Sequence, residues 1–407
     1  MVGGLVKIIA LVLMLALSTS CMKQNSSVNP SSFQDALKTS KAKTAAFYGW
    51  GGSAAVNKWI DEVVSSSLKQ KYDLTLKRVP MDINEILNKL TTEKQAGVEK
   101  GDIDVVWING ENFYTAKKNG LLYGPIINKV ENYSKYIDAD SADARLDFGN
   151  SIDGMEVPFG KAQLVFITDT EKVKDLPISA LKLLELAKTN KGKITYPAPP
   201  DFIGSAFVRN IIYDVAGFDA IYNAKADLDQ IYEAAKPAFD YMNMLEQYLW
   251  QEGKTYPRDS AALDKMFSDG QLLMTMSYTP LHAAQKIAEN QFPQTSATFV
   301  FDNGNIGNTH YMAIPYSSPN KDAALVLINH ILSVEMQASK YDIKNWGDLP
   351  VLDMKRLKGE EKAVFNKLDN GKGILTPEEL LLKRQPEVQA EKVSVIEKLW
   401  YEKVLKN

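Results

Sequence analysis

Residues 44–53 read Thr44-Ala-Ala-Phe-Tyr-Gly-Trp-Gly-Gly-Ser53, an apolar run that ends in glycines and a serine. The apolar run predicts a buried strand, and the glycines predict a turn directly after it. Ser53 is a typical N-cap for a following helix. Apolar residues at three- and four-residue spacing over residues 55–68 indicate that helix. The stretch therefore predicts a strand–turn–helix unit of an α/β protein.

The same alternation continues along the chain. We predict strands over residues 74–79 and 103–108 with a helix over 83–90 between them, which favours a mostly parallel sheet. After residue 157 the pattern indicates a second α/β lobe. Its predicted strands are 163–168, 194–196 and 272–278, and its predicted helices are 179–189 and a helix from Ser205. A further strand over 310–314 and a helix over 322–332 follow.

The N-terminus has the pattern of an export signal. Lys7 precedes an unbroken apolar run of ten residues, which is too short for a bilayer that takes about 20 residues. Residues 1–20 are therefore predicted to be a signal peptide. Cys21 follows small residues as in a bacterial lipobox, although Ser18 stands where leucine is usual. We expect Cys21 to carry a lipid; the alternative is ordinary cleavage nearby, which would leave a free thiol. Residues 21–43 are polar and are predicted to form a flexible tether.

Composition and motifs exclude several classes of protein. The 407 residues carry 47 Lys+Arg and 50 Asp+Glu, a formal net charge of −3, which argues against nucleic-acid binding. A single cysteine excludes an intramolecular disulfide and a cysteine-based zinc site. The sequence shows no phosphate loop and no nucleophile elbow, and its three histidines lack metal-ligand spacing. We expect no enzymatic activity, no metal and no cofactor.

Candidate ligand residues gather where strands run into helices. Ligands of open α/β sheets lie outside the carboxyl ends of the strands, where glycines and helix N-termini expose backbone N–H groups. Ser53 and Ser205 are each either a cap alone or a cap that also contacts a ligand. The aromatic residues either stack on a flat or cationic ligand or pack as core. Glu111 and Asp201 are either first-turn acids or partners for a ligand cation. The candidates are Trp50, Gly51, Gly52, Ser53, Trp107, Asn109, Glu111, Phe159, Asp201, Phe202, Gly204, Ser205, Tyr256 and Tyr278.

Four stretches carry a resemblance to a known family. They are Phe47-Tyr-Gly-Trp-Gly-Gly-Ser-Ala-Ala-Val-Asn-Lys-Trp59, Gly101-Asp-Ile-Asp-Val-Val-Trp-Ile-Asn-Gly-Glu-Asn-Phe113, Val157-Pro-Phe-Gly-Lys-Ala-Gln163 and Asn308-Thr-His-Tyr-Met-Ala-Ile-Pro315. In their order and spacing the chain resembles the solute-binding proteins of ABC importers. The similarity is to the YnjB-like branch of the type II periplasmic-binding-protein superfamily, which is related to binders of iron, polyamines and thiamine. The iron binders use a Tyr-Tyr pair, whereas this chain has only Tyr278 after Ser277.

The resemblance implies a two-lobed periplasmic-binding-protein-like α/β fold, with a ligand cleft between the lobes and crossing hinge strands. Crossings are expected near 158–163, 307–310 and 349–352. Lobe 1 would comprise residues 44–157 plus 310–349, and lobe 2 residues 158–309 plus 350–407.

The resemblance also implies a function. The chain would be an exported monomer that is lipid-anchored at the outer face of the cytoplasmic membrane or lies in the periplasm. It would capture a small solute, thiamine-like or phosphate-bearing, by hinge closure and deliver it to ABC permease subunits with a cytoplasmic ATPase. The alternatives are a surface receptor and an extracellular enzyme on a similar scaffold.

Overall fold

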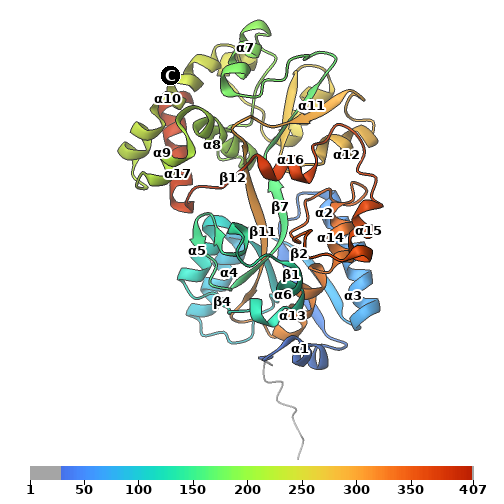
Figure 1. The fold of residues 1–407 in the computed structure, drawn as a ribbon. Helices are drawn as coiled ribbons and strands as arrows, with labels where there is room; N and C mark the ends of the chain where they lie inside the picture. Colours follow the sequence, from blue (N-terminus) through green and yellow to red (C-terminus); the bar gives the residue numbers. More distant parts are fainter. Residues whose placement is uncertain (1–28, 406–407) are drawn as a thin grey trace, which may run out of the picture.

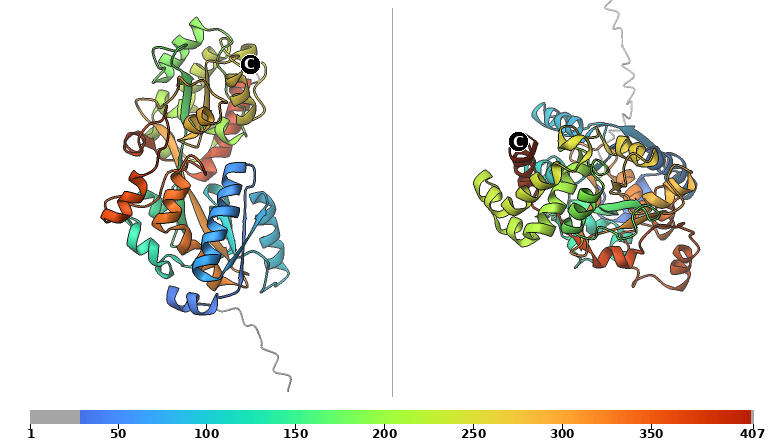
Figure 2. Two further views of the ribbon diagram at one scale, coloured as in Figure 1. Left: turned by 90° about the vertical axis from the view of Figure 1, so that its right-hand side faces the viewer. Right: turned by 90° about the horizontal axis from the view of Figure 1, so that it is seen from above.

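The structure, a computed structural model, describes residues 29–405 as two α/β lobes stacked along one long axis (Figures 1 and 2). The predicted signal peptide and Cys21 lie outside the described residues. Within residues 29–405, no helix is both long and apolar enough to cross a bilayer.

Lobe 1, the lower lobe in Figure 1, is built on a twisted sheet with the strand order β12-β11-β3-β1-β2. Parallel pairing of β1 with both β2 and β3 confirms the predicted parallel core of this sheet. The strands of this lobe and its sheet are β1 (Thr44–Gly49), β2 (Thr75–Pro80), β3 (Val105–Ile108), β4 (Leu122–Tyr123), β5 (Leu146–Asp147), β6 (Asn150–Ser151), β7 (Glu156–Gln163) and β11 (Asn305–Pro315). The last strand of the sheet, β12 (Arg384–Gln385), pairs with the end of β11 that lies in lobe 2.

Helices cover both faces of this sheet. The predicted helix over residues 55–68 is longer than expected and contains a π-helical stretch, because α2 runs through η1 into α3. The helices of lobe 1 are α1 (Phe33–Thr39), α2 (Ala54–Lys58), η1 (Trp59–Val64), α3 (Ser65–Tyr72), α4 (Ile83–Gln95), α5 (Gly110–Lys118), η2 (Ile127–Lys129), α6 (Glu131–Tyr136), η3 (Ala142–Ala144), α13 (Lys321–Ile331), α14 (Val334–Tyr341) and α15 (Gly359–Asn366).

Lobe 2, the upper lobe, surrounds a smaller antiparallel sheet of order β10-β8-β9. Its strands are β8 (Val165–Asp169), β9 (Met274–Ser277) and β10 (Ser296–Phe299). Its helices are α7 (Ala180–Thr189), α8 (Phe202–Ala216), α9 (Phe218–Asn223), α10 (Leu228–Glu246), η4 (Trp250–Gly253), α11 (Ser260–Ser268), α12 (His282–Ala288), α16 (Pro377–Leu382), α17 (Ala390–Trp400) and η5 (Tyr401–Leu405). The predicted strand 194–196 is wrong: the segment is buried, but Ile194 accepts a single hydrogen bond from the Trp250 N–H instead of joining a ladder.

Two strands run from one lobe into the other. β7 and β11 pair in antiparallel register from Gly307 opposite Gln163 to Ala313 opposite Glu156, with a register shift between His310 and Tyr311. A single bridge joins Lys161 to Leu349, beside this ladder. The predicted crossings at 158–163 and 307–310 therefore fall within one continuous two-stranded ribbon that connects the two sheets (Figure 1).

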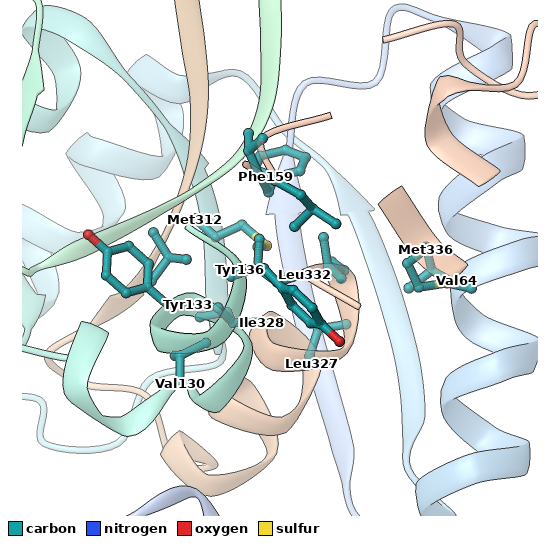
Figure 3. Packing of buried hydrophobic residues seen from close by; sticks show 14 of the residues in the cluster. Val64, Val130, Tyr133, Tyr136, Phe159, Met312, Leu327, Ile328, Leu332 and Met336 are labelled. Atoms are coloured by element: carbon teal, nitrogen blue, oxygen red, sulfur yellow. The ribbon is translucent and has the colours of Figure 1, made fainter. Parts of the chain in front are cut away.

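The ribbon is part of both hydrophobic cores. In lobe 1, Phe159 of β7 and Met312 of β11 are buried with Ile328 and Leu332, which come from α13 and its C-terminal end (Figure 3). In lobe 2, Ile306 of β11 is buried in a separate cluster with residues of α8 and α10. Because each end of the ribbon is held in a different core, the segment between them connects two bodies with separate interiors.

Two of the predicted boundaries need correction. Residues 21–43 were expected to be a flexible tether, but α1 folds onto α13 with Phe33 and Ala36 buried and Ser32 as its N-cap. The helix has only seven residues, too few to give a clear periodic signal. Residues 350–407 were assigned to lobe 2, but α15 packs against α14, and its Glu361 accepts a hydrogen bond from Tyr136 of lobe 1. The C-terminal segment therefore returns to lobe 1 before it enters lobe 2.

Candidate functional site

The junction between β1 and α2 exposes an aromatic side chain next to a capped helix start. Trp50 is 54% exposed, and the Ser53 hydroxyl accepts a hydrogen bond from the Val56 N–H at 3.4 Å, which confirms Ser53 as the N-cap. Gly52 leaves room for the Trp50 ring, which an added Cβ would displace. Gly51 is equally constrained, because its Cβ would meet Pro80 at 2.6 Å. The glycines thus let the chain turn tightly beneath an outward-facing tryptophan.

The junction between β3 and α5 places a carboxylate opposite lobe 2. Asn109 occupies the N-cap position, but its side chain makes no capping hydrogen bond within the described chain. Glu111 follows in the first turn and is exposed. Nevertheless, desolvation by the surrounding protein raises the pKa of Glu111. The positive charge of Arg209 lowers this pKa, and the negative charges of Glu397 and Glu387 raise it further. All three of these charged residues belong to lobe 2, so Glu111 lies in the space where the lobes meet.

The start of α8 differs from the predicted arrangement. Its N-cap is Asp201, whose carboxylate accepts hydrogen bonds from the N–H groups of Ile203 (3.0 Å) and Gly204 (2.9 Å). Gly204 permits the close approach of Pro197, whose carbonyl oxygen would lie 1.9 Å from an added Cβ. Ser205 was predicted to be a cap, but it lies inside the helix, one turn too late for that position. Phe202 is 50% exposed and is the outward-facing aromatic of this junction.

Ser205 instead belongs to a buried ionic network in lobe 2. Its hydroxyl donates to Glu397 and accepts from the Arg209 guanidinium at 2.6 Å. Arg209 also contacts both carboxylate oxygens of Glu387, at 3.1 and 3.2 Å, and Tyr278 donates to Glu387 at 3.0 Å. Burial alone would lower the pKa of Arg209, but the charge of Glu387 outweighs it and the pKa is raised. The network holds α8, β9 and the segment before α17 together.

Two predicted aromatic residues have different surroundings. Tyr278 is buried beside Phe202, with ring centroids 4.9 Å apart, and so supports the exposed phenylalanine. Tyr256 packs 5.1 Å from Tyr196 in the lobe 2 core, and its hydroxyl donates to Glu246. Tyr256 therefore serves packing, and the structure does not bring it to the junctions.

An aromatic cluster lies where the ribbon enters lobe 1. Trp107 is half-buried at the end of β3. Its ring centroid lies 5.4 Å from that of buried Phe159 and 5.0 Å from that of His310. His310 in turn stacks on Trp346 at 5.5 Å with an interplanar angle of 24°. The sequence analysis missed His310, Trp346 and Asn308 as site residues. The signal was present in the crossing strand, where Asn308 and His310 are spaced to share one face.

A metal site, or a hollow that contains the predicted ligand residues, would mark the position of a ligand within residues 29–405. Among residues 29–405, no group of three or more His, Cys, Asp or Glu side chains is arranged to hold a metal ion. A surface hollow of about 890 Å³ lies on lobe 1 between α6 and the β5–β6 hairpin. None of the predicted ligand residues lines this hollow. The predicted residues other than Tyr256 lie instead at the junctions, on the ribbon and in the lobe 2 network beside them.

Comparison with known proteins gives this arrangement a family. Residues 64–355 match the family model described as bacterial extracellular solute-binding protein. Over 329 residues the chain is 36% identical to Protein YnjB of Escherichia coli (strain K12), which covers 80% of this chain and 84% of that protein. The chain belongs to the bacterial extracellular solute-binding protein family. Membership of this family places its site of action outside the cytoplasm.

Solved structures share the two-lobed fold of this solute-binding protein. An ABC transporter structure from Clostridium perfringens ATCC 13124 matches with a TM-score of 0.61 and 17% identity, over 88% of this chain and 98% of that one. A periplasmic thiamin binding protein matches with a TM-score of 0.56 and 20% identity, over 87% of this chain and 95% of that one. At these identities the matches establish the fold.

Proposed function

We propose that the chain captures a small solute between its lobes, closes around it by bending at the β7–β11 ribbon, and delivers it to an ABC permease with a cytoplasmic ATPase. One observation carries this proposal: exposed Trp50 and Phe202 stand at helix starts of different lobes, and Glu111 of lobe 1 is influenced by charges of lobe 2. A ligand that contacts both lobes favours the closed arrangement by its differential affinity for it.

The chemistry of the junctions favours a planar or cationic solute. Exposed aromatic rings attract flat and cationic groups, and Glu111 adds a carboxylate. The N-terminus of α8 is already occupied by the carboxylate of Asp201, which disfavours an anionic group there. Support for a phosphate group therefore rests on the Ser53 end of α2 alone. A thiamine-like solute, with a cationic and a planar ring, agrees best with these groups.

The lobes that would move are defined by their contacts. In this proposal lobe 1 comprises residues 29–157 and 310–366, since Val351, Leu352 and Leu357 are buried in its core, and lobe 2 comprises residues 158–309 and 367–405. A third crossing was expected near 349–352, where Leu349 bridges to Lys161 of the ribbon, but Val351 and Leu352 remain in the lobe 1 core. Bending of the ribbon between the two cores would change the angle between the lobes and leave each interior intact.

Attachment to the membrane is a separate part of the proposal. Cys21 would carry the lipid, and the residues between it and α1 would span from the membrane surface to lobe 1. Incorporation of labelled fatty acid into the wild-type chain, but not into Cys21→Ser, is the expected result. Equal labelling of both proteins would contradict it.

Titration calorimetry and small-angle scattering of the purified chain test the capture step. The probes are thiamine, spermidine, fructose 6-phosphate and ferric citrate, which correspond to solutes named for proteins that share the fold. We expect thiamine to bind to a monomer and to lower its radius of gyration. Binding without any change in that radius would contradict hinge closure, and absence of binding by all four probes would contradict the proposed solute classes.

A further inference from the structure

Asn308 is a buried side chain whose hydrogen-bonding groups are both unused. It lies on β11 and is 4% exposed, and neither its amide nitrogen nor its amide oxygen has a hydrogen-bond partner among residues 29–405. Leaving one buried polar group unpaired costs about 1–3 kcal/mol, so an amide with two unpaired atoms is unfavourable for folding alone. Such a group indicates a partner that the chain itself does not supply.

The register of the ribbon explains why the amide has no partner. Asn308 lies opposite Ala162 and His310 lies opposite Gly160, so the neighbouring strand offers no polar side chain on this face. On the other face Thr309 is paired, since its hydroxyl donates to Asp143 at 2.8 Å. The two faces of one strand thus differ: on one the side chain is satisfied within the protein, and on the other the buried amide of Asn308 lies beside Ala162 without a partner among residues 29–405.

His310 continues the same face toward lobe 1. Side chains two residues apart on a strand point to the same side, which places the imidazole next to the amide. Its Nε2 lies 3.5 Å from Asp348, whereas its buried Nδ1 has no partner among the described residues. The ring is fixed by stacking on Trp346 and by the edge contact with Trp107, which is half-buried. The aromatic cluster therefore orients a second unused hydrogen-bonding atom.

The location of these groups connects them with solute capture. They lie in the part of β11 between its pairing with β12 in lobe 2 and its pairing with β3 in lobe 1. This is the segment that connects the two cores and on which bending would act. Because both amide atoms are buried in this structure, a solute would reach them only when bending of the ribbon exposes this face.

We infer that Asn308 and His310 form a recognition site for a flat group that carries a hydrogen-bond donor next to an acceptor, as in an aminopyrimidine or an amide. This inference rests on the proposed capture function and names the class of solute for it. The carboxamide offers one donor and one acceptor side by side, so it matches such an edge with two hydrogen bonds. Trp107 then lies beside the ring of the solute, and Phe202 and Trp50 contact the remainder from the two lobes.

The test compares two ligands on two proteins. The probes are thiamine, which has an aminopyrimidine ring, and 3-benzyl-5-(2-hydroxyethyl)-4-methylthiazolium, which has a plain phenyl ring in its place. By titration calorimetry, the wild-type chain is expected to prefer thiamine by at least about tenfold, the equivalent of two good hydrogen bonds. Asn308→Leu, which keeps the branched shape and removes both polar atoms, is expected to abolish this preference.

Thermal unfolding without ligand gives a second readout, with Asn305 as the matched control. Asn305 lies on the same strand, but its amide is fully used: its oxygen accepts from the Phe301 N–H and from Asn210, and its nitrogen donates to the Leu164 carbonyl. Asn305→Leu should lower the melting temperature by several degrees. Asn308→Leu should leave it unchanged or raise it, because it removes a group that is unpaired in the folded protein.

Each outcome decides between two conclusions. Equal thiamine affinity in wild type and Asn308→Leu overturns the inference, and so does a melting temperature of Asn308→Leu that falls like that of Asn305→Leu. Failure of wild type to bind thiamine overturns it as well, while closure around spermidine, fructose 6-phosphate or ferric citrate would leave the capture function standing. If Asn308→Leu does not fold, Asn308→Ala takes its place in both measurements.

Discussion

The starts of α2 and α8 are capped by different chemical groups. At α2 the neutral hydroxyl of Ser53 caps the helix beneath exposed Trp50, whereas at α8 the carboxylate of Asp201 is the cap. The serine near the second cap, Ser205, is instead buried in an ionic network. The two segments are alike in composition, with glycine, serine and an aromatic residue just ahead of the helix in α2 and within its first turn in α8. Their electrostatics differ, because only the α2 end keeps its partial positive charge free of a nearby side-chain charge at the cap. A shared pattern of residue types therefore does not give the two lobes the same ligand preference.

The largest expected effect lies behind the α8 junction. Arg209→Met removes the partner of Glu387, and both side chains are only 2% exposed. Breaking a buried ion pair by deleting one charge costs about 3–5 kcal/mol, so the free energy of unfolding in urea should fall by that amount. Lys236→Met is the control, since Lys236 pairs with Asp240 on the surface and its loss should change little. Equal effects of the two substitutions would contradict a structural role for the network.

The two serines are expected to differ in the same experiment. Ser205→Ala deprives both Arg209 and Glu397 of a hydrogen bond in a buried setting, a loss of about 1–3 kcal/mol. Ser53→Ala removes only an N-cap, a loss of about 1 kcal/mol. The reverse order of stabilities would show that the hydroxyl of Ser53, rather than that of Ser205, is the structural one.

The exposed aromatic residues are expected to matter for binding and hardly for folding. Trp50→Ala should weaken thiamine binding by at least about 1 kcal/mol, which is the range for loss of an aromatic contact. Phe202→Ala should act similarly from the other lobe. Tyr222→Ala is the control, because Tyr222 is exposed on α9 and lies outside the junctions. Unchanged affinity in Trp50→Ala by calorimetry would remove that residue from the site.

The smallest effect on stability is expected at the α8 cap itself. Asparagine and aspartate are equally good N-caps, so Asp201→Asn should change the free energy of unfolding by less than about 0.5 kcal/mol. Burial raises the pKa of Asp201, which agrees with a charge that is not favoured at this position. Without that charge, the helix end should tolerate an anion, and fructose 6-phosphate should bind more tightly to Asp201→Asn than to wild type. Unchanged affinity would indicate that the phosphate group does not reach α8.

Local pattern predicted much of lobe 1 and less of lobe 2. The strand 44–49 and the cap at Ser53 were correct, because apolar periodicity and capping act over a few residues. The strand predicted at 194–196 was wrong, since a buried segment such as Ile194-Thr-Tyr196 becomes a strand only if another strand is there to pair with it. The cap at Ser205 was wrong because two possible caps, Asp201 and Ser205, lie four residues apart, and the earlier one starts the helix.

The sequence by itself determined the α/β order, the position of the first junction and the family, because these depend on residue types at short spacing and on their order along the chain. Only the tertiary structure decided which polar groups remain unused. Ser205 is bound by Glu397 from 192 positions away, whereas Asn308 faces Ala162 and has no partner within residues 29–405. Hydrogen bonding of a buried group depends on what the folded chain places next to it, and spacing along the sequence does not contain that information.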